Sequence, residues 1–287
     1  MKLAFLGTPE VAAATLRRLV DAGHDIRVVV TRPDVRRGRG NQESPSPVKL
    51  AAAELGLPVA HKAADVVGTG AELGVVVAFG RIIKPEVLAA LPMVNVHFSL
   101  LPRWRGAAPV ERAILAGDTE TGVCLMQLEE GLDTGPVFSR ARVAIGAEET
   151  ADELRMRLSE EGTGLLLDAL AHGFGDPQPQ VGEATYAAKL EPGELELDFA
   201  LAATVCLRVI RVGRSWTTWK GKRLIVHRAR ALPNQGDLSP GEIQGHIVGT
   251  GEGALELVLV QPEGKPAMSA ADWARGARLQ PGDHLGS

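Results

Sequence analysis

Aromatic residues and cysteines are scarce in this sequence. Phe, Trp and Tyr make up 4% of the 287 residues, so a hydrophobic core must rely on Leu, Val and Ala. The two cysteines, Cys124 and Cys206, lie far apart and lack metal-ligand spacing, which argues against a disulfide framework and a zinc site. We therefore expect a reduced, cytoplasmic protein that holds no metal.

Long hydrophobic runs are also missing. The longest apolar stretches span about six to eight residues, whereas a membrane-spanning helix needs about 20. The opening MKLAFLG carries one Lys and is too short for the apolar region of a secretory leader. We expect neither a leader nor a membrane span. Apolar residues at 45% and charged residues at 23% are typical of a globular protein.

Acidic residues are absent from one long stretch. The net charge of −4 alone argues against a nucleic-acid partner, but the charge is unevenly distributed. Residues 1–198 hold 20 Lys and Arg against 28 Asp and Glu, and residues 199–287 hold 11 against 7. Residues 199–236 contain eight basic residues and no acidic one. This segregation is typical of a polyanion-binding face, although charge alone slightly favours an ordinary solvated surface.

Short apolar runs alternate with helical patterns in the first part of the chain. We expect strands at residues 2–7, 26–31, 74–80 and 94–99. We expect helices from Pro9, with Thr8 as the N-cap, to Gly23, and at 47–55 and 85–91. This order predicts right-handed crossovers and a doubly wound, mostly parallel, Rossmann-like α/β sheet. The Val-rich strands fit burial on both faces.

In the later part of the chain, the α/β pattern gives way first to a linker and then to short strands. A helix should follow Pro109, then strands at 122–127 and 136–145, then a helix at 151–171 that Thr150 and Glu153 cap. A Pro- and Gly-rich stretch predicts a linker at 177–198 between a domain at 1–176 and one at 199–287. Beyond a helix near 200–211, short strands separated by Gly turns favour a smaller C-terminal β-barrel of OB-like type.

The strand at 94–99 carries unusual polar residues. Asn95 and His97 lie two apart, so an extended backbone directs both side chains to one face of the sheet. Ligands of open α/β sheets gather at the carboxyl ends of the strands. Asn offers a neutral donor, and His offers a donor or a base. Together they can stabilise a developing oxyanion.

A second polar feature is the segment EEGLDTG, which places Asp133 between two glycines. The backbone of such a turn can approach another group closely. Taken alone, Asp133 is better explained as a residue that caps its own turn.

The two features together resemble the folate-dependent formyltransferases. The likeness rests on Asn-x-His-x-Ser-Leu-Leu-Pro followed by Gly-x-Asp-x-Gly. It is closest to the family members that formylate methionyl initiator tRNA for translation initiation. Their segments resemble SPSPVK (44–49), SLLPRWRGAAP (99–109), QPQ…YAAKL (178–190), WTTWKGKRL (216–224) and LQPG (279–282).

The resemblance implies roles for the polar residues. Asn95, His97 and Asp133 would be catalytic in moving a formyl group from 10-formyltetrahydrofolate to the methionine amine. Asn95 and His97 would donate to the formyl oxygen, and Asp133 would orient His97 and relay a proton. The implied folate pocket would use Phe79, Gly80, Ile82, Ser99, Leu100, Leu101, Pro102, Leu128 and Asp133.

The resemblance also implies a tRNA-binding surface, and we expect a monomer. Residues at the positions that contact tRNA or methionine in the family are Val11, Arg36, Arg37, Arg39, Arg208, Arg211, Lys220, Lys222 and Arg223. By composition alone, the loop at 32–49 is an ordinary flexible surface loop. The sequence departs from the family at Val11, where an aromatic is common, at residues 41–43, where lysines are usual, and at the shortened 212–216 segment.

The sequence disfavours three other functions. A relative that acts on an amino-sugar nucleotide or purine precursor would have little use for an Arg-rich loop and a basic C-terminal domain. A non-catalytic RNA-binding protein would not need the complete Asn95, His97 and Asp133 set. A dinucleotide oxidoreductase is disfavoured because no G-x-G-x-x-G follows the first strand.

Overall fold

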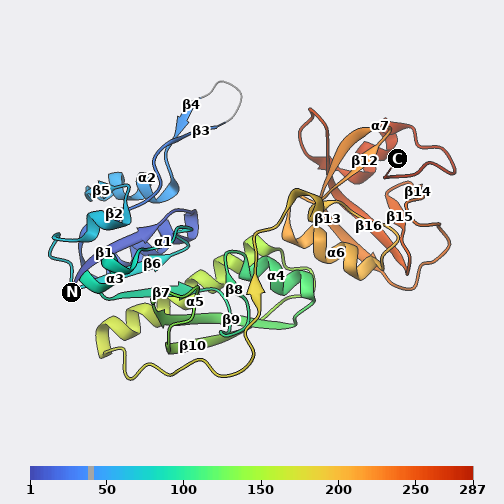
Figure 1. Ribbon diagram of the computed structural model, residues 1–287. Coiled ribbons are helices and arrows are strands. Elements are labelled where there is room, and N and C mark those ends of the chain that lie inside the picture. The colour runs from blue at the N-terminus through green and yellow to red at the C-terminus, as the bar shows by residue number, and fades with distance from the viewer. Residues whose placement is uncertain (38–41, 287) are drawn as a thin grey trace. The chain divides into compact units, whose positions relative to one another are not determined.

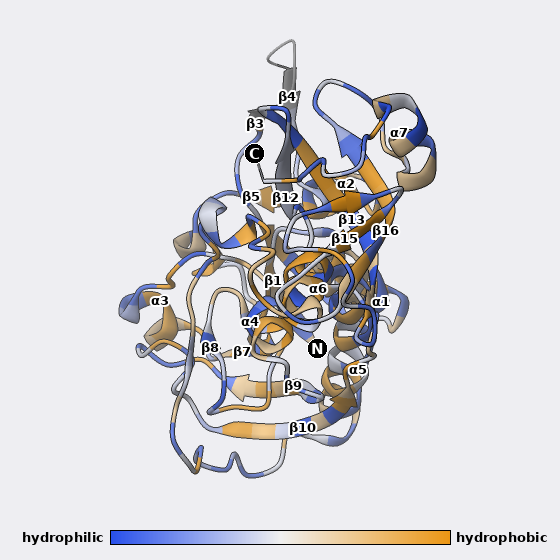
Figure 2. Cartoon of the chain, turned by 90° about the vertical axis from the view of Figure 1, so that its right-hand side faces the viewer, coloured by the Kyte–Doolittle hydropathy of each residue, from blue (hydrophilic) through white to orange (hydrophobic). Residues whose placement is uncertain are grey.

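The computed structural model describes residues 1–37 and 42–286 and divides the chain into two compact units (Figure 1). Unit 1 comprises Met1–Val110, Glu120–Ala144 and Arg155–Ala188. Unit 2 comprises Glu111–Thr119, Ile145–Leu154 and Lys189–Ser287. Each unit has its own strands and buried apolar residues. In Figure 2 the hydrophobic colour gathers on the strands of both units.

Unit 1 is built on a seven-stranded sheet in the order β10-β9-β7-β6-β1-β2-β5. Its strands are β1 (Lys2–Gly7), β2 (Asp25–Val30), β5 (Val59–Ala60), β6 (Leu73–Val77), β7 (Met93–His97), β9 (Glu120–Gln127) and β10 (Val137–Ala144). The first five are parallel, and β9 and β10 are antiparallel. Leu3, Phe5 and Val75 are fully buried, as the Val- and Leu-rich strands predict. The predicted Rossmann-like, mostly parallel sheet is confirmed.

The strand order reverses between β1 and β6. The chain passes from β1 outward to β2 and β5, and then returns to β6 and continues to β7 on the other side. Such a switch point leaves a crevice at the carboxyl ends of the strands, where ligands of doubly wound sheets bind. The ends of β6 and β7 therefore define where a functional site is expected.

The helices of the first 172 residues lie close to the predicted ranges. They are α1 (Glu10–Asp21), α2 (Pro47–Glu54), α3 (Pro85–Ala90), α4 (Pro109–Ala116) and α5 (Ala151–His172), with the short 3₁₀ helix η1 (Ala63–Val66). The cap of α5 is confirmed, because Glu153 Oε2 accepts from both the backbone N–H and the hydroxyl of Thr150, each at 2.8 Å. The Thr8 cap is wrong: the extended backbone of Pro9 makes Pro9 the N-cap.

Several short strands were not foreseen. Strand β3 (Val35–Arg37) pairs antiparallel with β4 (Gln42–Ser44), and β8 (Arg105–Gly106) pairs in parallel with β11 (Tyr186–Ala187). Two-residue strands leave almost no periodic signal, because alternation needs at least four residues to be recognised. The β8–β11 pair matters for function, since it attaches a late segment to the loop that follows β7.

Unit 2 contains a curled antiparallel sheet in the order β12-β13-β16-β15-β14, with β17 paired to β16. Its elements are η2 (Pro192–Leu195), α6 (Ala203–Val212), β12 (Trp216–Trp219), β13 (Lys222–Leu232), β14 (Ile243–Gln244), β15 (Ile247–Gly249), β16 (Ala254–Pro262), β17 (Met268–Ser269) and α7 (Ala270–Ala277). Cys206 and Ile210 of α6, Val226 of β13 and Trp273 of α7 pack in one buried cluster. The predicted barrel-like C-terminal domain is confirmed.

The predicted linker at 177–198 is ordered by specific contacts. Arg112 in α4 donates two hydrogen bonds to the Glu194 carboxylate in η2, at 2.6 and 3.1 Å. These bonds hold the pKa of Glu194 below its ordinary value. The earlier half of the stretch belongs to unit 1, and the half from Lys189 belongs to unit 2. We propose residues 177–198 as the linker between a domain at 1–176 and a domain at 199–287.

Candidate functional site

Strand β7 positions the two central polar residues. Asn95 pairs with Val76 of β6 and Met126 of β9, and His97 is the last residue of the strand. The regular pairing keeps the alternation intact, so both side chains project from the same face. His97 is 5% exposed, and Asn95 is half-buried. In the described part of the chain, no protein group is hydrogen-bonded to the Asn95 amide, which leaves its donors for a ligand.

The His97 ring is held from both sides. Its Nε2 lies 3.0 Å from the carbonyl oxygen of Trp104, and its Nδ1 lies 3.7 Å from Asp133 Oδ2. Because a carbonyl can only accept, Nε2 must carry a hydrogen. A second proton would therefore go onto Nδ1 and face the carboxylate. Since 3.7 Å is longer than a hydrogen bond, Nδ1 is not hydrogen-bonded to the carboxylate in this arrangement.

Asp133 follows β9 in a turn with a left-handed backbone, with φ of 49°. Its Oδ2 accepts a 2.7 Å hydrogen bond from the backbone N–H of Gly106, and its side chain is 12% exposed. The carboxylate therefore points inward to the loop after β7 and to His97, rather than capping its own turn. The structure brings Asp133 and His97 together, whereas Asp133 taken alone had been better explained as a turn cap.

The loop after β7 is rigid and is anchored at several points. Ser99 is fully buried, and its hydroxyl donates to the Arg103 carbonyl at 2.6 Å. Leu101 packs with Cys124, Met126 and Val137. The Leu101–Pro102 peptide is cis. These contacts make Ser99 and Leu101 supports of the loop.

The late segment at 180–187 closes over this loop and was missed as part of the site. Thr185 accepts from the Trp104 N–H at 2.9 Å through its hydroxyl and from the Arg105 N–H at 2.8 Å through its carbonyl. At Gly106, φ is 120° and an added Cβ would lie 2.9 Å from the Ala187 carbonyl oxygen, so the pairing of β8 with β11 requires glycine there. The signal was present in the QPQ…YAAKL motif, but its Pro and Gly content favoured a linker.

The residues predicted for the folate pocket occupy two kinds of environment. Phe79 is 5% exposed in a buried cluster that Leu128 packs against, and Gly80 follows in a turn with φ of 73°. Ile82, by contrast, is 88% exposed. Leu100 and Pro102 belong to the loop after β7, beside the supports Ser99 and Leu101. The predicted set therefore combines buried apolar side chains, such as Phe79, with loop residues that follow β6 and β7, among which Ile82 is exposed.

Val11 lies at the start of α1, just beyond the switch point, and is 8% exposed. Its carbonyl accepts hydrogen bonds from the Thr15 hydroxyl at 3.1 Å and the Ser159 hydroxyl at 3.2 Å. Its apolar side chain is thus part of the buried core of unit 1. Arg36 and Arg37 belong to strand β3, and Arg39 lies outside the described residues.

The predicted cations of unit 2 fall into two groups. Lys220 on the turn after β12, and Lys222 and Arg223 at the start of β13, are exposed. Lys220 Nζ lies 4.7 Å from the centre of the Trp219 ring, and Arg223 Cζ lies 4.1 Å from that of Trp216. These cations stack on partly buried aromatic rings, which holds their positive charge at a defined place on the surface.

Arg208 and Arg211 on α6 make internal contacts instead. Arg211 donates to the carbonyl oxygens of Glu149 and Gly146 at 2.8 and 2.7 Å, and burial lowers the pKa of its guanidinium. The Arg208 guanidinium covers Gly117, where an added Cβ would meet it at 2.4 Å. Arg211 therefore stabilises the segment that contains Gly146 and Glu149, whether or not it also contacts tRNA.

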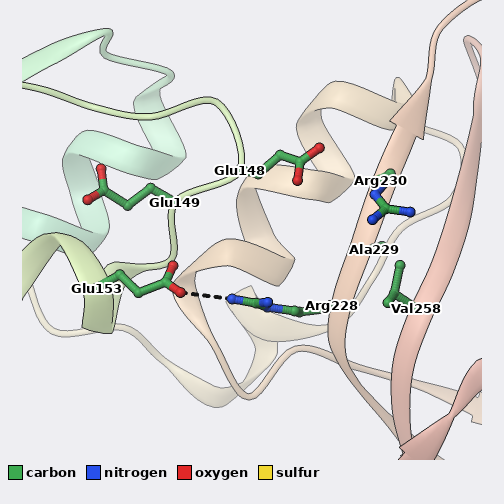
Figure 3. A pocket seen from close by; sticks show the side chains of 7 residues that line it. All are labelled: Glu148, Glu149, Glu153, Arg228, Ala229, Arg230 and Val258. Atoms are coloured by element: carbon green, nitrogen blue, oxygen red, sulfur yellow. Dashed lines mark hydrogen bonds and ion pairs between the residues drawn. The ribbon is translucent and has the colours of Figure 1, made fainter.

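An open pocket of about 330 Å³ lies elsewhere in unit 2, and Figure 3 shows its lining. It is lined by Glu148, Glu149, Glu153, Arg228, Ala229, Arg230 and Val258. Arg228 donates to Glu153 at 2.8 Å, and Arg230 pairs with Glu256 at 3.3 Å. The lining of this pocket contains none of the predicted catalytic residues.

Two further features concern the helices and the metal-ligating side chains of residues 1–37 and 42–286. None of these helices is both long and apolar enough to span a membrane. None of the described His, Cys, Asp and Glu residues gather in threes that could hold a metal ion.

Comparisons with known proteins place the chain among formyltransferases. Residues 1–170 match the family model "Formyl transferase", and residues 189–278 match "Formyl transferase, C-terminal domain". The methionyl-tRNA formyltransferase of Jannaschia sp. (strain CCS1) is 44% identical over 304 residues, which cover 99% of this chain and 100% of the relative.

Two solved structures share the fold. One is the methionyl-tRNA formyltransferase from Clostridium thermocellum, with a TM-score of 0.60 at 19% identity, covering 82% of this chain and 95% of that one. The other is an N-formyltransferase from Helicobacter canadensis with folinic acid and dTDP-3-aminofucose, with a TM-score of 0.70 at 16% identity, covering 90% and 99%.

Proposed function

The chain belongs to the formyl transferase family, and from that membership we propose how its residues carry out formyl transfer. Its activity is transfer of a formyl group to methionyl-tRNA, the activity of relatives similar to it from end to end. The finer proposal is that the donor is 10-formyltetrahydrofolate and that the acceptor is the α-amine of methionine on initiator tRNA. The observation that carries the chemistry is the 3.7 Å approach of His97 Nδ1 to Asp133 Oδ2 at the sheet's ligand-binding edge.

His97 acts through its Nδ1 edge in this proposal. Because Nε2 is committed to the Trp104 carbonyl, only Nδ1 is left to donate a hydrogen bond to the formyl oxygen, through a proton that it takes from solvent before the reaction and keeps throughout. The nearby Asp133 carboxylate stabilises the charged ring that results. The His97 donor is therefore strongest when negative charge develops on that oxygen, which is the requirement for lowering the barrier.

Asn95 supplies the second donor. Its amide projects from the same face of β7 and has no protein partner among the described residues, so no existing hydrogen bond must break for it to donate. A fixed donor of this kind contributes roughly 3–4 kcal/mol to the stabilisation of an oxyanion. Asp133 accepts the proton that the attacking amine loses and passes it to the folate nitrogen from which the formyl carbon departs.

The loop residues fit a folate. Bound folate supplies the formyl carbon on a nitrogen that can leave once it is protonated. Ala78, with φ of 46°, and Gly80, with φ of 73°, turn the chain after β6 and open backbone donors and acceptors there. The exposed Ile82 and the buried Phe79 add apolar surface of the kind that covers a flat ring. We propose Phe79, Gly80, Ile82, Ser99, Leu100, Leu101, Pro102, Leu128 and Asp133 as the folate-binding set.

The basic residues bind the tRNA in this proposal. Lys220, Lys222 and Arg223 contact phosphates of the acceptor stem, with a lesser part for Arg208 and Arg211 because both also make internal contacts. Arg36, Arg37 and Arg39 approach the unpaired end of the tRNA, and Val11 borders the methionine side chain. We propose that the chain acts as a monomer, and in the cytoplasm because charged tRNA is found there.

A direct assay tests this function. The chain is incubated with 10-formyltetrahydrofolate and methionine-charged initiator tRNA, with charged elongator tRNA in a parallel reaction. We expect formylmethionyl-tRNA from the initiator and far less from the elongator. Equal formylation of both would refute initiator selectivity, and formylation of free amino-sugar nucleotides in preference to tRNA would refute the proposed acceptor.

A further inference from the structure

Gln180 joins three parts of the site through a single side chain. Its Nε2 donates to the carbonyl oxygens of Asp133 and Gly135, each at 2.8 Å. Its Oε1 accepts from Arg105 Nε at 3.0 Å and Arg105 Nη2 at 2.7 Å. One half-buried amide thus connects the segment at 180–187 with the Asp133 turn and with the loop after β7.

These contacts use the full hydrogen-bonding capacity of the amide. A glutamine side chain has two N–H donors and one oxygen with two lone pairs, and each has a partner here. The orientation is dictated by the neighbours, because a guanidinium only donates and a carbonyl only accepts. Reversing the amide would place N–H groups against Arg105 and an oxygen against two carbonyls. No substitution among the natural side chains reproduces this set of bonds.

The turn that Gln180 braces is one that needs support. Asp133 adopts a left-handed backbone with φ of 49°, a conformation that costs a non-glycine residue of the order of 1 kcal/mol. The Asp133 carboxylate accepts from the N–H of Gly106, which directly follows Arg105. Gln180 is therefore hydrogen-bonded on both sides of the Gly106–Asp133 hydrogen bond. On one side it bonds the side chain of Arg105, which precedes Gly106, and on the other side it bonds the Asp133 carbonyl.

We propose that Gln180 is a positioning residue for formyl transfer, which holds the Asp133 carboxylate at its distance from His97 by bracing the Asp133–Gly135 turn against Arg105. This inference rests on the proposed function, in which Asp133 handles the proton of the attacking amine. Gln180 itself touches neither substrate nor the reacting atoms. Its effect is on the rate of the chemical step, because the carboxylate must be correctly placed only when the proton moves.

Two variants distinguish the hydrogen bonds of Gln180 to Arg105 from its hydrogen bonds to the Asp133–Gly135 turn. Gln180→Ala removes all four hydrogen bonds. Gln180→Glu keeps an acceptor for Arg105 but replaces the donors to Asp133 and Gly135 with an oxygen. The matched control is Gln178→Ala, since the Gln178 side chain is exposed and donates to the Asp176 carbonyl within its own segment. Formylation is measured over a range of tRNA and donor concentrations that extends to saturation, and thermal unfolding is recorded for every variant.

Both Gln180 variants should lower kcat about 10- to 100-fold while each KM changes less than about threefold, and Gln178→Ala should match the wild type. In an Asp133→Asn background, Gln180→Ala should add no further loss, since the two residues act through one another. A Gln180→Ala enzyme with wild-type kcat overturns the proposal. So does a Gln180→Glu enzyme with wild-type kcat, because bracing Arg105 alone would then suffice, or a full additional loss in the Asp133→Asn background. If the wild type fails to formylate charged tRNA, the proposed function fails instead.

Discussion

A methyl group at Gly135 should displace the catalytic carboxylate. Gly135 is buried at the end of the Asp133 turn, and a Cβ added there would lie 2.0 Å from the carbonyl oxygen of Gln127. Ordinary contact begins at 3.4 Å, so the two segments must separate by more than an ångström. Gln127 cannot yield, because it pairs with Val94 of β7 and donates to the Pro136 carbonyl. The turn that carries Asp133 must move instead.

The size of the effect follows from this geometry. Overpacking of this kind costs roughly 1–3 kcal/mol of stability. A displacement of about 1 Å at a group that takes part in proton transfer lowers kcat about 100-fold. Gly131→Ala is the matched control, because its nearest contacts would all be with the exposed side chain of Thr134, at 2.3 Å from Oγ1, 2.9 Å from Cγ2 and 3.1 Å from Cβ, rather than with the backbone of a neighbouring strand. We expect Gly131→Ala to remain within about threefold of the wild type.

The assay is steady-state formylation of charged initiator tRNA at a temperature where thermal unfolding shows both variants to be folded. Gly135→Ala should show the large loss in kcat with little change in KM for tRNA. The reasoning is refuted if Gly135→Ala is folded and as active as Gly131→Ala, because the carboxylate would then tolerate a displaced turn.

Three further predictions follow from the same structure. Asn95→Ala and His97→Ala should each lower kcat about 10²–10³-fold, with gel-shift affinity for charged tRNA unchanged; weakened tRNA binding in step with the reduced rate would contradict the oxyanion role. Combined replacement of Lys220, Lys222 and Arg223 by Ala should weaken tRNA binding and flatten its dependence on salt by roughly one unit of slope for each phosphate that is no longer neutralised, whereas an unchanged slope would remove this surface from the interface. Burial raises the pKa of Cys206 from 9.0 to about 11, so between these values the unfolded chain loses a proton that the folded chain keeps, and stability falls as pH rises. Urea unfolding at pH 8 and pH 10 should show a loss of stability larger by about 1 kcal/mol in the wild type than in Cys206→Ala, and equal losses would argue against a buried, neutral thiol.

The sequence predicted those parts of the site that depend on local periodicity. Strand alternation placed Asn95 and His97 on one face, and β7 keeps that alternation without a bulge. The paired glycines suggested a close backbone approach at Asp133, and an added Cβ at Gly135 would indeed meet the Gln127 carbonyl. On periodicity alone, Asp133 was better explained as a turn cap; only the family resemblance linked it to His97.

The contacts that brace the site were beyond prediction from periodicity. Gln180 lies 47 residues from Asp133 and 75 from Arg105, and its neighbours in sequence are prolines and glycines typical of linkers. The contact of His97 with Trp104 depends on how the loop after β7 folds back, which only the assembled loop reveals. Both are tertiary contacts made by segments without regular secondary structure, where neither alternation nor helical spacing gives a signal.

The account depends most directly on the carboxylate that faces His97. Asp133→Asn keeps the size of the side chain and an oxygen for the Gly106 N–H, but removes the negative charge and the base. The decisive measurement is the single-turnover rate of formyl transfer to charged initiator tRNA with enzyme in excess, alongside tRNA binding by gel shift. The account predicts that the rate falls at least about 100-fold while binding is preserved. A wild-type rate in this variant would contradict it.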